Sequence, residues 1–214
     1  MEYQVSSREY LYRAKSRLAE GTNESLFYAA FELRCGIEAR MQEYLNAWSH
    51  ISKKKKKGWQ IAALGRNIEN AFKTGNRIVR WAVLSQETEK LIVSYYYTPV
   101  SENIKKAAEE LGNYMHSMKI YKNTSDPFWL DFRNKLDDIY KKLLAANTGT
   151  LLGPPLIKAG TTKVDMNIEL PPNVNSKDLI DTIIKQGRVI IDVSYLTQLP
   201  DVLEEEAQVW DMSD

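Results

Sequence analysis

Two ionisable side chains lie among apolar residues in the segment FYAAFELRCGIEAR, which spans residues 27–40. Arg34 and Glu38 are four residues apart, so a helix would place them on one face, where they can form an ion pair. An arginine can stabilise the charge that develops on a reacting phosphate, and a neighbouring carboxylate can orient the arginine. The spacing therefore predicts either a structural pair that ties helices or subunits together, or a charged pocket in a helical bundle.

His116 is the second candidate for acid–base chemistry, because histidine exchanges protons near neutral pH. On a helix, it lies about 100° from the nearest apolar stripe and beside Lys105, Glu109 and Gly112. This position predicts that His116 lies on an exposed side of its helix or at an interface with another element. His116 is there either an ordinary surface histidine or a proton shuttle that works with Arg34 from another helix.

A run of five lysines is the densest charge feature of the chain. It consists of Lys53, Lys54, Lys55, Lys56 and Lys57, followed by Gly58 and Trp59. Clustered lysines attract phosphates, and an indole ring can stack on a base. The run predicts either a solvated loop or a sequence-independent contact with RNA or DNA.

The composition is typical of a soluble globular protein, with 214 residues, 43% hydrophobic and 27% charged. No apolar run is long enough to span a membrane, and the polar start of the chain lacks the apolar stretch of a secretory signal. The single cysteine, Cys35, excludes an internal disulfide and suits a cytoplasmic protein. Because His50 and His116 are far apart, we expect no metal site, and the absence of a glycine-rich phosphate loop predicts no cofactor.

The periodicity of apolar residues predicts a mainly α fold in the first part of the chain. Helices are expected at about 6–20, 23–49, 59–72, 101–118 and 126–147. Between the third and the fourth, RIVRWAVL and LIVSYYYT are rich in β-branched and aromatic residues and predict a β-hairpin. The run of Tyr95, Tyr96 and Tyr97 on its second strand is expected either in the core or in a contact at the edge of the sheet. Residues 1–147 are therefore predicted to form a helical bundle with an inserted β-hairpin at about 77–98.

The segment GTLLGPP marks a boundary, and residues 148–214 are predicted to form a small α/β appendage. A strand at 163–170, a helix at 176–186 and a strand at 188–196 suggest a right-handed crossover with parallel strands. These strands either join the hairpin or add to the sheet of a partner. The appendage is acidic, with 5 basic and 11 acidic residues, and it ends in an acidic tail, whereas residues 1–147 carry 24 basic and 17 acidic residues.

The segments LFYAAFELRCGIEARMQEYL and LGNYMHSMK, with a further helix after them, resemble the HEPN superfamily of prokaryotic helical-bundle proteins. The resemblance covers roughly residues 5–147. Many members serve in phage defence and toxin–antitoxin systems, and many are metal-independent ribonucleases. The family's nuclease motif is an arginine followed, after four to six residues, by a histidine. No arginine stands at that spacing before His116 or His50.

The resemblance implies two alternative functions. The first is a non-catalytic subunit of a prokaryotic defence or conflict assembly. It would bind a partner protein or a second copy of itself, and it would contact RNA or DNA through Lys53–Lys57 and Trp59. The second is a metal-independent ribonuclease toxin or effector. Arg34 would stabilise the phosphorane-like charge, Glu38 would orient Arg34, and His116 would shuttle the proton. The missing motif favours the first.

Overall fold

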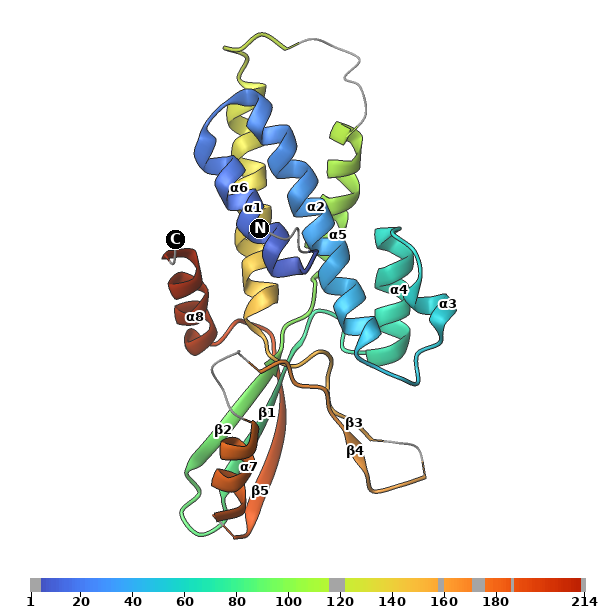
Figure 1. The fold of residues 1–214 in the computed structure, drawn as a ribbon, viewed down its shortest axis with the longest axis vertical. Helices are drawn as coiled ribbons and strands as arrows, with labels where there is room; N and C mark the ends of the chain where they lie inside the picture. Colours follow the sequence, from blue (N-terminus) through green and yellow to red (C-terminus); the bar gives the residue numbers. More distant parts are fainter. Residues whose placement is uncertain (1–4, 116–121, 158–159, 171–175, 186, 213–214) are drawn as a thin grey trace. The chain divides into compact units, whose positions relative to one another are not determined.

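The protein is mainly α-helical with a small antiparallel sheet, as predicted (Figure 1). The computed structural model describes residues 5–115, 122–157, 160–170, 176–185 and 187–212. The chain divides into two compact units. The helical unit consists of Met1–Gly75 and Val100–Asn147, and the sheet unit consists of Asn76–Pro99 and Thr148–Asp214.

The helical unit is built around one long central helix, α2 (Asn23–Asn46). The other elements are α1 (Ser7–Glu20), α3 (Lys53–Lys56), α4 (Ile61–Phe72), α5 (Glu102–Leu111), the 3-10 turn η1 (Gly112–Met115) and α6 (Phe128–Thr148). α2 contacts α1, α4 and α5 (Figure 1). Its side chains at Leu33, Ile37 and Met41 are fully buried. The predicted helical bundle in this part of the chain is therefore confirmed.

Short polar side chains and one glycine set the helix ends. Gly21 ends α1 with a φ of 74°, a left-handed conformation that glycine adopts without strain. The Thr22 side chain then accepts a hydrogen bond from the backbone N–H of Ser25 and caps α2. Ser101 caps α5 in the same way, by accepting from the backbone N–H of Ile104.

A buried arginine joins three helices of this unit. Arg40 is 0% exposed. Its Nε lies 3.0 Å from the Tyr44 hydroxyl and 3.1 Å from the Ala146 carbonyl oxygen on α6, and its Nη1 lies 3.0 Å from Glu43 Oε2. Glu43 Oε1 in turn accepts the backbone N–H of Ser7 at the start of α1, at 2.8 Å. A buried charge is stable only with such partners, so this network fixes how α1, α2 and α6 meet.

The sheet unit contains a three-stranded sheet in the order β2-β1-β5, in which both strand pairs are antiparallel. The strands are β1 (Ile78–Ser85), β2 (Leu91–Tyr97) and β5 (Val189–Leu196), and the remaining elements are β3 (Leu156–Ile157), β4 (Val164–Asp165), α7 (Ser176–Lys185) and α8 (Asp201–Met212). The predicted β-hairpin is confirmed. The tyrosine run lies in the core, since Tyr95, Tyr96 and Tyr97 are 8%, 9% and 0% exposed.

The predicted parallel crossover is wrong, whereas the alternative that a strand of the appendage joins the hairpin is confirmed for β5. β5 pairs antiparallel with β1 along its whole length, whereas the strand expected at 163–170 is reduced to β4, which pairs with β3. A two-stranded parallel pair is marginal by itself, and the free side of β1 offers β5 a complete antiparallel ladder. The expected hairpin at 77–98 consequently lies in one unit with residues 148–214, instead of with the helices.

The acidic end of the chain is a helix and not a tail. Leu203 of α8 is 3% exposed and packs against Ile78 and Tyr96 of the sheet. The neighbouring acidic side chains, Glu204 and Glu205, are exposed. In the described part of the chain, no helix is both long and apolar enough to cross a membrane.

Replacement of Arg40 by Met should lower the free energy of unfolding by about 2–4 kcal/mol, because Glu43 loses its cation and the links to α6 weaken. Urea unfolding followed by circular dichroism measures the change. Arg17→Met is the matched control, since Arg17 and Glu20 form a pair whose side chains are 45% and 44% exposed. The control should change by less than about 1 kcal/mol. Equal effects of the two substitutions would contradict a special role for Arg40.

Candidate functional site

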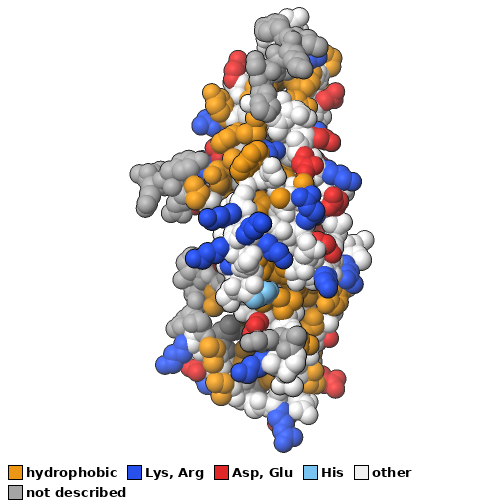
Figure 2. All heavy atoms as spheres, turned by 90° about the vertical axis from the view of Figure 1, so that its right-hand side faces the viewer, with side chains coloured by type: hydrophobic (Ala, Val, Ile, Leu, Met, Phe, Trp, Pro, Cys, Tyr) orange, Lys and Arg blue, Asp and Glu red, His pale blue; other side chains and the backbone are white. Residues whose placement is uncertain are grey.

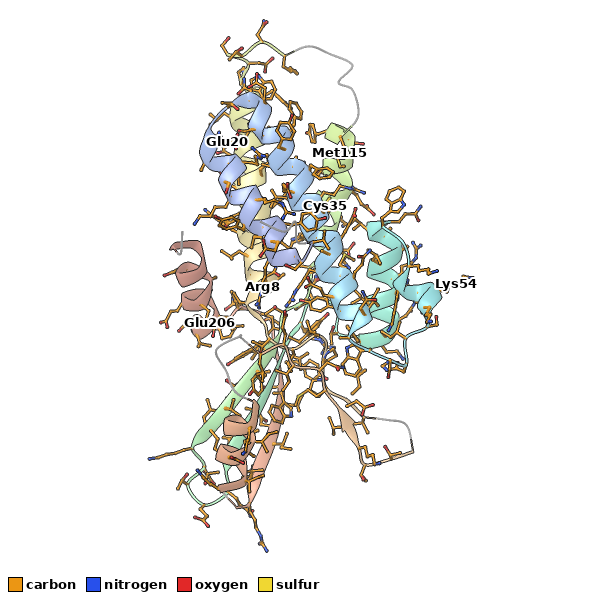
Figure 3. The ribbon with its side chains drawn as sticks, viewed as in Figure 1. Arg8, Glu20, Cys35, Lys54, Met115 and Glu206 are labelled. Atoms are coloured by element: carbon orange, nitrogen blue, oxygen red, sulfur yellow. The ribbon has the colours of Figure 1, made fainter. Side chains whose placement is uncertain are left out.

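Arg34 and Glu38 form the predicted ion pair, and they line a pocket of the helical unit. Arg34 Nε lies 3.2 Å from Glu38 Oε1, and the two side chains are 12% and 18% exposed. The pocket has a volume of about 400 Å³. Its other lining residues are Phe31, Cys35, Trp59, Gly112 and Met115. Figure 3 labels two of them, Cys35 on α2 and Met115 at the end of η1.

Arg34 is also a structural tie between α2 and α5. Its Nη1 donates a hydrogen bond to the Ala108 carbonyl oxygen at 2.6 Å. Gly112 follows one turn later, and a Cβ at this position would lie 2.9 Å from Arg34 Nη1. The glycine therefore leaves room for the guanidinium. The two alternatives predicted for the pair are compatible here, because it both joins helices and lines a pocket.

Burial controls the proton affinity of the acidic groups in the pocket. Burial raises the pKa of Glu38 above its ordinary value, and the nearby Arg34 guanidinium opposes this with a smaller effect. Burial and, to a smaller extent, the carboxylates of Glu38 and Glu32 raise the pKa of the Cys35 thiol to about 11. The thiol is protonated at neutral pH and is a poor nucleophile. The chemistry of the pocket therefore rests on the guanidinium and the carboxylate.

The lysine run is ordered as one helical turn, α3, whose side chains lie mostly in solvent. The Asn67 side chain donates to the Lys55 carbonyl oxygen at 2.9 Å, and the Gln42 side chain donates to the Gly58 carbonyl oxygen at 2.8 Å. These bonds attach the backbone of the run to α4 and α2. Lys54 extends outward from α3 (Figure 3), and Figure 2 shows Lys and Arg side chains gathered on this face.

Trp59 joins the lysine run to the pocket. The residue is 65% exposed, and it lines the same pocket as Arg34 and Glu38. The sequence predicted the ion pair and the lysine run as separate features, since they lie 15 or more residues apart. In the structure, the exposed Trp59, two residues after the lysine run, lines the pocket of the ion pair.

His116 lies outside the residues that the structure describes, so its predicted pairing with Arg34 stays a prediction. Two walls of the pocket were not predicted from the sequence. Phe31 and Met115 line the pocket, and each is 43% exposed. Apolar periodicity alone does not distinguish a buried stripe from the wall of an open pocket. Within the described ranges, no group of three or more His, Cys, Asp or Glu side chains is placed to hold a metal ion.

No protein-family model matches this chain, and neither a curated protein nor a solved structure matches it. The resemblance to the HEPN superfamily stays a prediction from the quoted segments.

The pKa of Glu38 predicts a specific pH dependence of stability. Because this pKa is raised in the fold, the folded protein holds the proton over an interval, starting near 4.5, in which the unfolded chain has lost it. The contribution of Glu38 to the free energy of unfolding therefore decreases as the pH rises through this interval. Urea unfolding of the wild type and Glu38→Gln at several pH values should show the stability of the wild type, relative to the variant, falling as the pH rises. A difference that is constant or rises with pH would contradict the raised pKa.

Proposed function

We propose that this protein is a HEPN-like, non-catalytic subunit of a prokaryotic, cytoplasmic defence or conflict assembly. It binds RNA or DNA on the helical unit, and it binds a partner protein. The observation that carries the proposal is that the exposed Trp59, two residues after the lysine run in the chain, lines the pocket of Arg34 and Glu38.

Electrostatics and stacking support nucleic-acid binding at this surface. The ammonium groups of Lys53, Lys54 and Lys55 project into solvent from a helical turn whose backbone is attached to α2 and α4. Phosphates that bind there release counterions, which favours association without reading the sequence. An exposed indole next to such a run can stack on an unpaired base, and this combination is typical of proteins that bind single strands.

The contacts of Arg34 support a non-catalytic role. Its guanidinium is held by Glu38 and by the Ala108 carbonyl oxygen, which gives the side chain a structural task. The Arg–His nuclease motif is also absent from the sequence. A ribonuclease that uses Arg34, Glu38 and His116 is the second candidate. The observation in its favour is that Arg34 lines an open pocket together with Met115, the residue before His116.

The sheet unit supports a protein partner. β5 forms one edge of the three-stranded sheet. On this strand Ile191 and Tyr195 are 58% and 53% exposed, and Val193 is 43% exposed. A long, apolar edge strand invites the addition of a further strand, and soluble proteins usually protect such edges. A strand of a partner protein, or of a second copy of this chain, would cover it.

Substitution of all five residues Lys53–Lys57 by Gln should weaken the binding of single strands irrespective of their sequence. The plot of log K against log salt concentration should become flatter by about 0.7–0.9 for each phosphate that the variant no longer neutralises. Fluorescence anisotropy at several salt concentrations measures both quantities. The matched control replaces five other lysines by Gln: Lys15, Lys90, Lys141, Lys142 and Lys163. Equal weakening in both variants would indicate a general charge effect and contradict a site at α3.

Purified wild-type protein should not cleave a mixed RNA pool in the presence of EDTA. The reason is that Arg34 is engaged by Glu38 and Ala108. Gel electrophoresis of the RNA after incubation is the measurement, and the assay is repeated with the partner protein once it is identified. Cleavage by the wild type that disappears in His116→Ala would overturn the non-catalytic assignment and establish the ribonuclease.

A further inference from the structure

The pocket of Arg34 and Glu38 has the volume and the walls of a site for a small ligand. Its volume of about 400 Å³ lies within the range of small-molecule sites. Phe31, Met115 and Trp59 supply apolar walls, and the indole of Trp59 is largely exposed. Such sites are typically apolar with a few placed polar groups that fix the orientation of the ligand.

The polar groups of this pocket offer one donor and one acceptor next to each other. Arg34 uses Nε toward Glu38 Oε1 and Nη1 toward the Ala108 carbonyl oxygen. Among the described residues, neither Arg34 Nη2 nor Glu38 Oε2 has a hydrogen-bond partner. A ligand that enters between the apolar walls therefore meets a cationic donor and an anionic acceptor that are four residues apart on α2.

Of the four RNA bases, guanine fits this pair best. Its Watson–Crick edge carries two adjacent N–H donors, at N1 and N2, beside the O6 acceptor. Glu38 Oε2 can accept from one N–H group, and Oε1 has a second lone pair for the other beside its bond to Arg34. A guanidinium can donate to O6, as arginine commonly does to guanine. Adenine and cytosine present a ring nitrogen acceptor next to their amino group, so its lone pair would face the carboxylate. Uracil presents only one N–H.

We propose that the pocket is a recognition site for a guanine base, read by Glu38 and Arg34 and stacked on Trp59. The proposal rests on the proposed nucleic-acid binding, because the lysines of α3 would hold the phosphates of the strand from which the base is turned out. Enzymes and binding proteins that read a single base turn it out of its stack in the same way, between aromatic and apolar side chains. A free guanine nucleotide presents the same edge, so the experiment separates the two sources.

The test compares oligouridine strands of about seven nucleotides that carry a central guanosine, adenosine or uridine. Fluorescence anisotropy at about pH 8 should show at least about tenfold tighter binding of the guanosine strand than of the other two. Glu38→Gln keeps the shape of the side chain and removes the charge. This variant should lose the preference for guanosine, so that the guanosine strand binds no more tightly than the other two.

A second variant keeps the proposal testable if Glu38→Gln perturbs the fold. Met115→Trp changes a residue that is 43% exposed. The larger side chain should fill the pocket, and both residues of the ion pair are kept. This variant should also lose the preference for guanosine. Trp59→Ala should weaken the binding of all three strands by about fivefold or more, because stacking does not depend on the base.

Guanosine monophosphate alone identifies the source of the base. One outcome is that guanosine monophosphate binds the wild type but not Glu38→Gln, and that the three strands bind equally. This outcome supports the guanine site and assigns it to a free guanine nucleotide. Equal binding of all strands together with no binding of the nucleotide overturns the guanine site but leaves the proposed nucleic-acid binding intact. A preference for guanosine that survives in Glu38→Gln also overturns it. Failure to bind any strand, with the nucleotide still bound, overturns the proposed function alone.

Discussion

The burial of one positive charge organises the helical unit. Arg40 is fully buried, so its guanidinium needs partners from the protein, and it finds them on its own helix and on α6. This requirement fixes the rotation of α2 about its axis. Glu38 is two residues from Arg40, so the two side chains point about 200° apart. When Arg40 faces α6, Glu38 and Arg34 face α5 and the pocket.

Close packing supports this arrangement on the inner side of α2. At Gly36 a Cβ would lie 3.0 Å from the side chain of Leu143 and 3.2 Å from that of Tyr10, so a larger residue would force α1 or α6 outward. The absence of a side chain also lets the Ser7 hydroxyl donate to the Gly36 carbonyl oxygen at 2.8 Å. Asn147 donates to the same hydroxyl from α6, at 3.0 Å. Sterics and hydrogen bonds thus select the same approach of three helices.

α2 carries ionic pairs with different energetic roles on its two sides. The network of Arg40 is closed, because its donors meet acceptors inside the helical unit. The pair of Arg34 and Glu38 borders a pocket instead, and burial of the carboxylate there outweighs the attraction of the guanidinium, as the raised pKa shows. A partly satisfied pair costs stability that a fully apolar wall would not cost. A ligand that supplies the remaining hydrogen bonds would recover this energy, which links the stability of the fold to the proposed binding site.

Local sequence patterns determined the helices and strands of this protein, and tertiary contacts decided how most of them meet. Periodicity predicted α2, the hairpin and the ion pair of Arg34 and Glu38, because backbone geometry sets which residues share a face within one element. Periodicity did not reveal the burial of Arg40, since its acceptor on α6 is 106 residues away. It left open whether β5 forms a parallel crossover or joins the hairpin, and β5 joins a hairpin that ends more than 90 residues earlier. Periodicity also did not predict that Trp59 lines one pocket with Arg34 and Glu38, because a pocket forms only where separate helices leave a gap. The spacing of residues along the chain does not predict such gaps, because they form only when whole helices pack against one another.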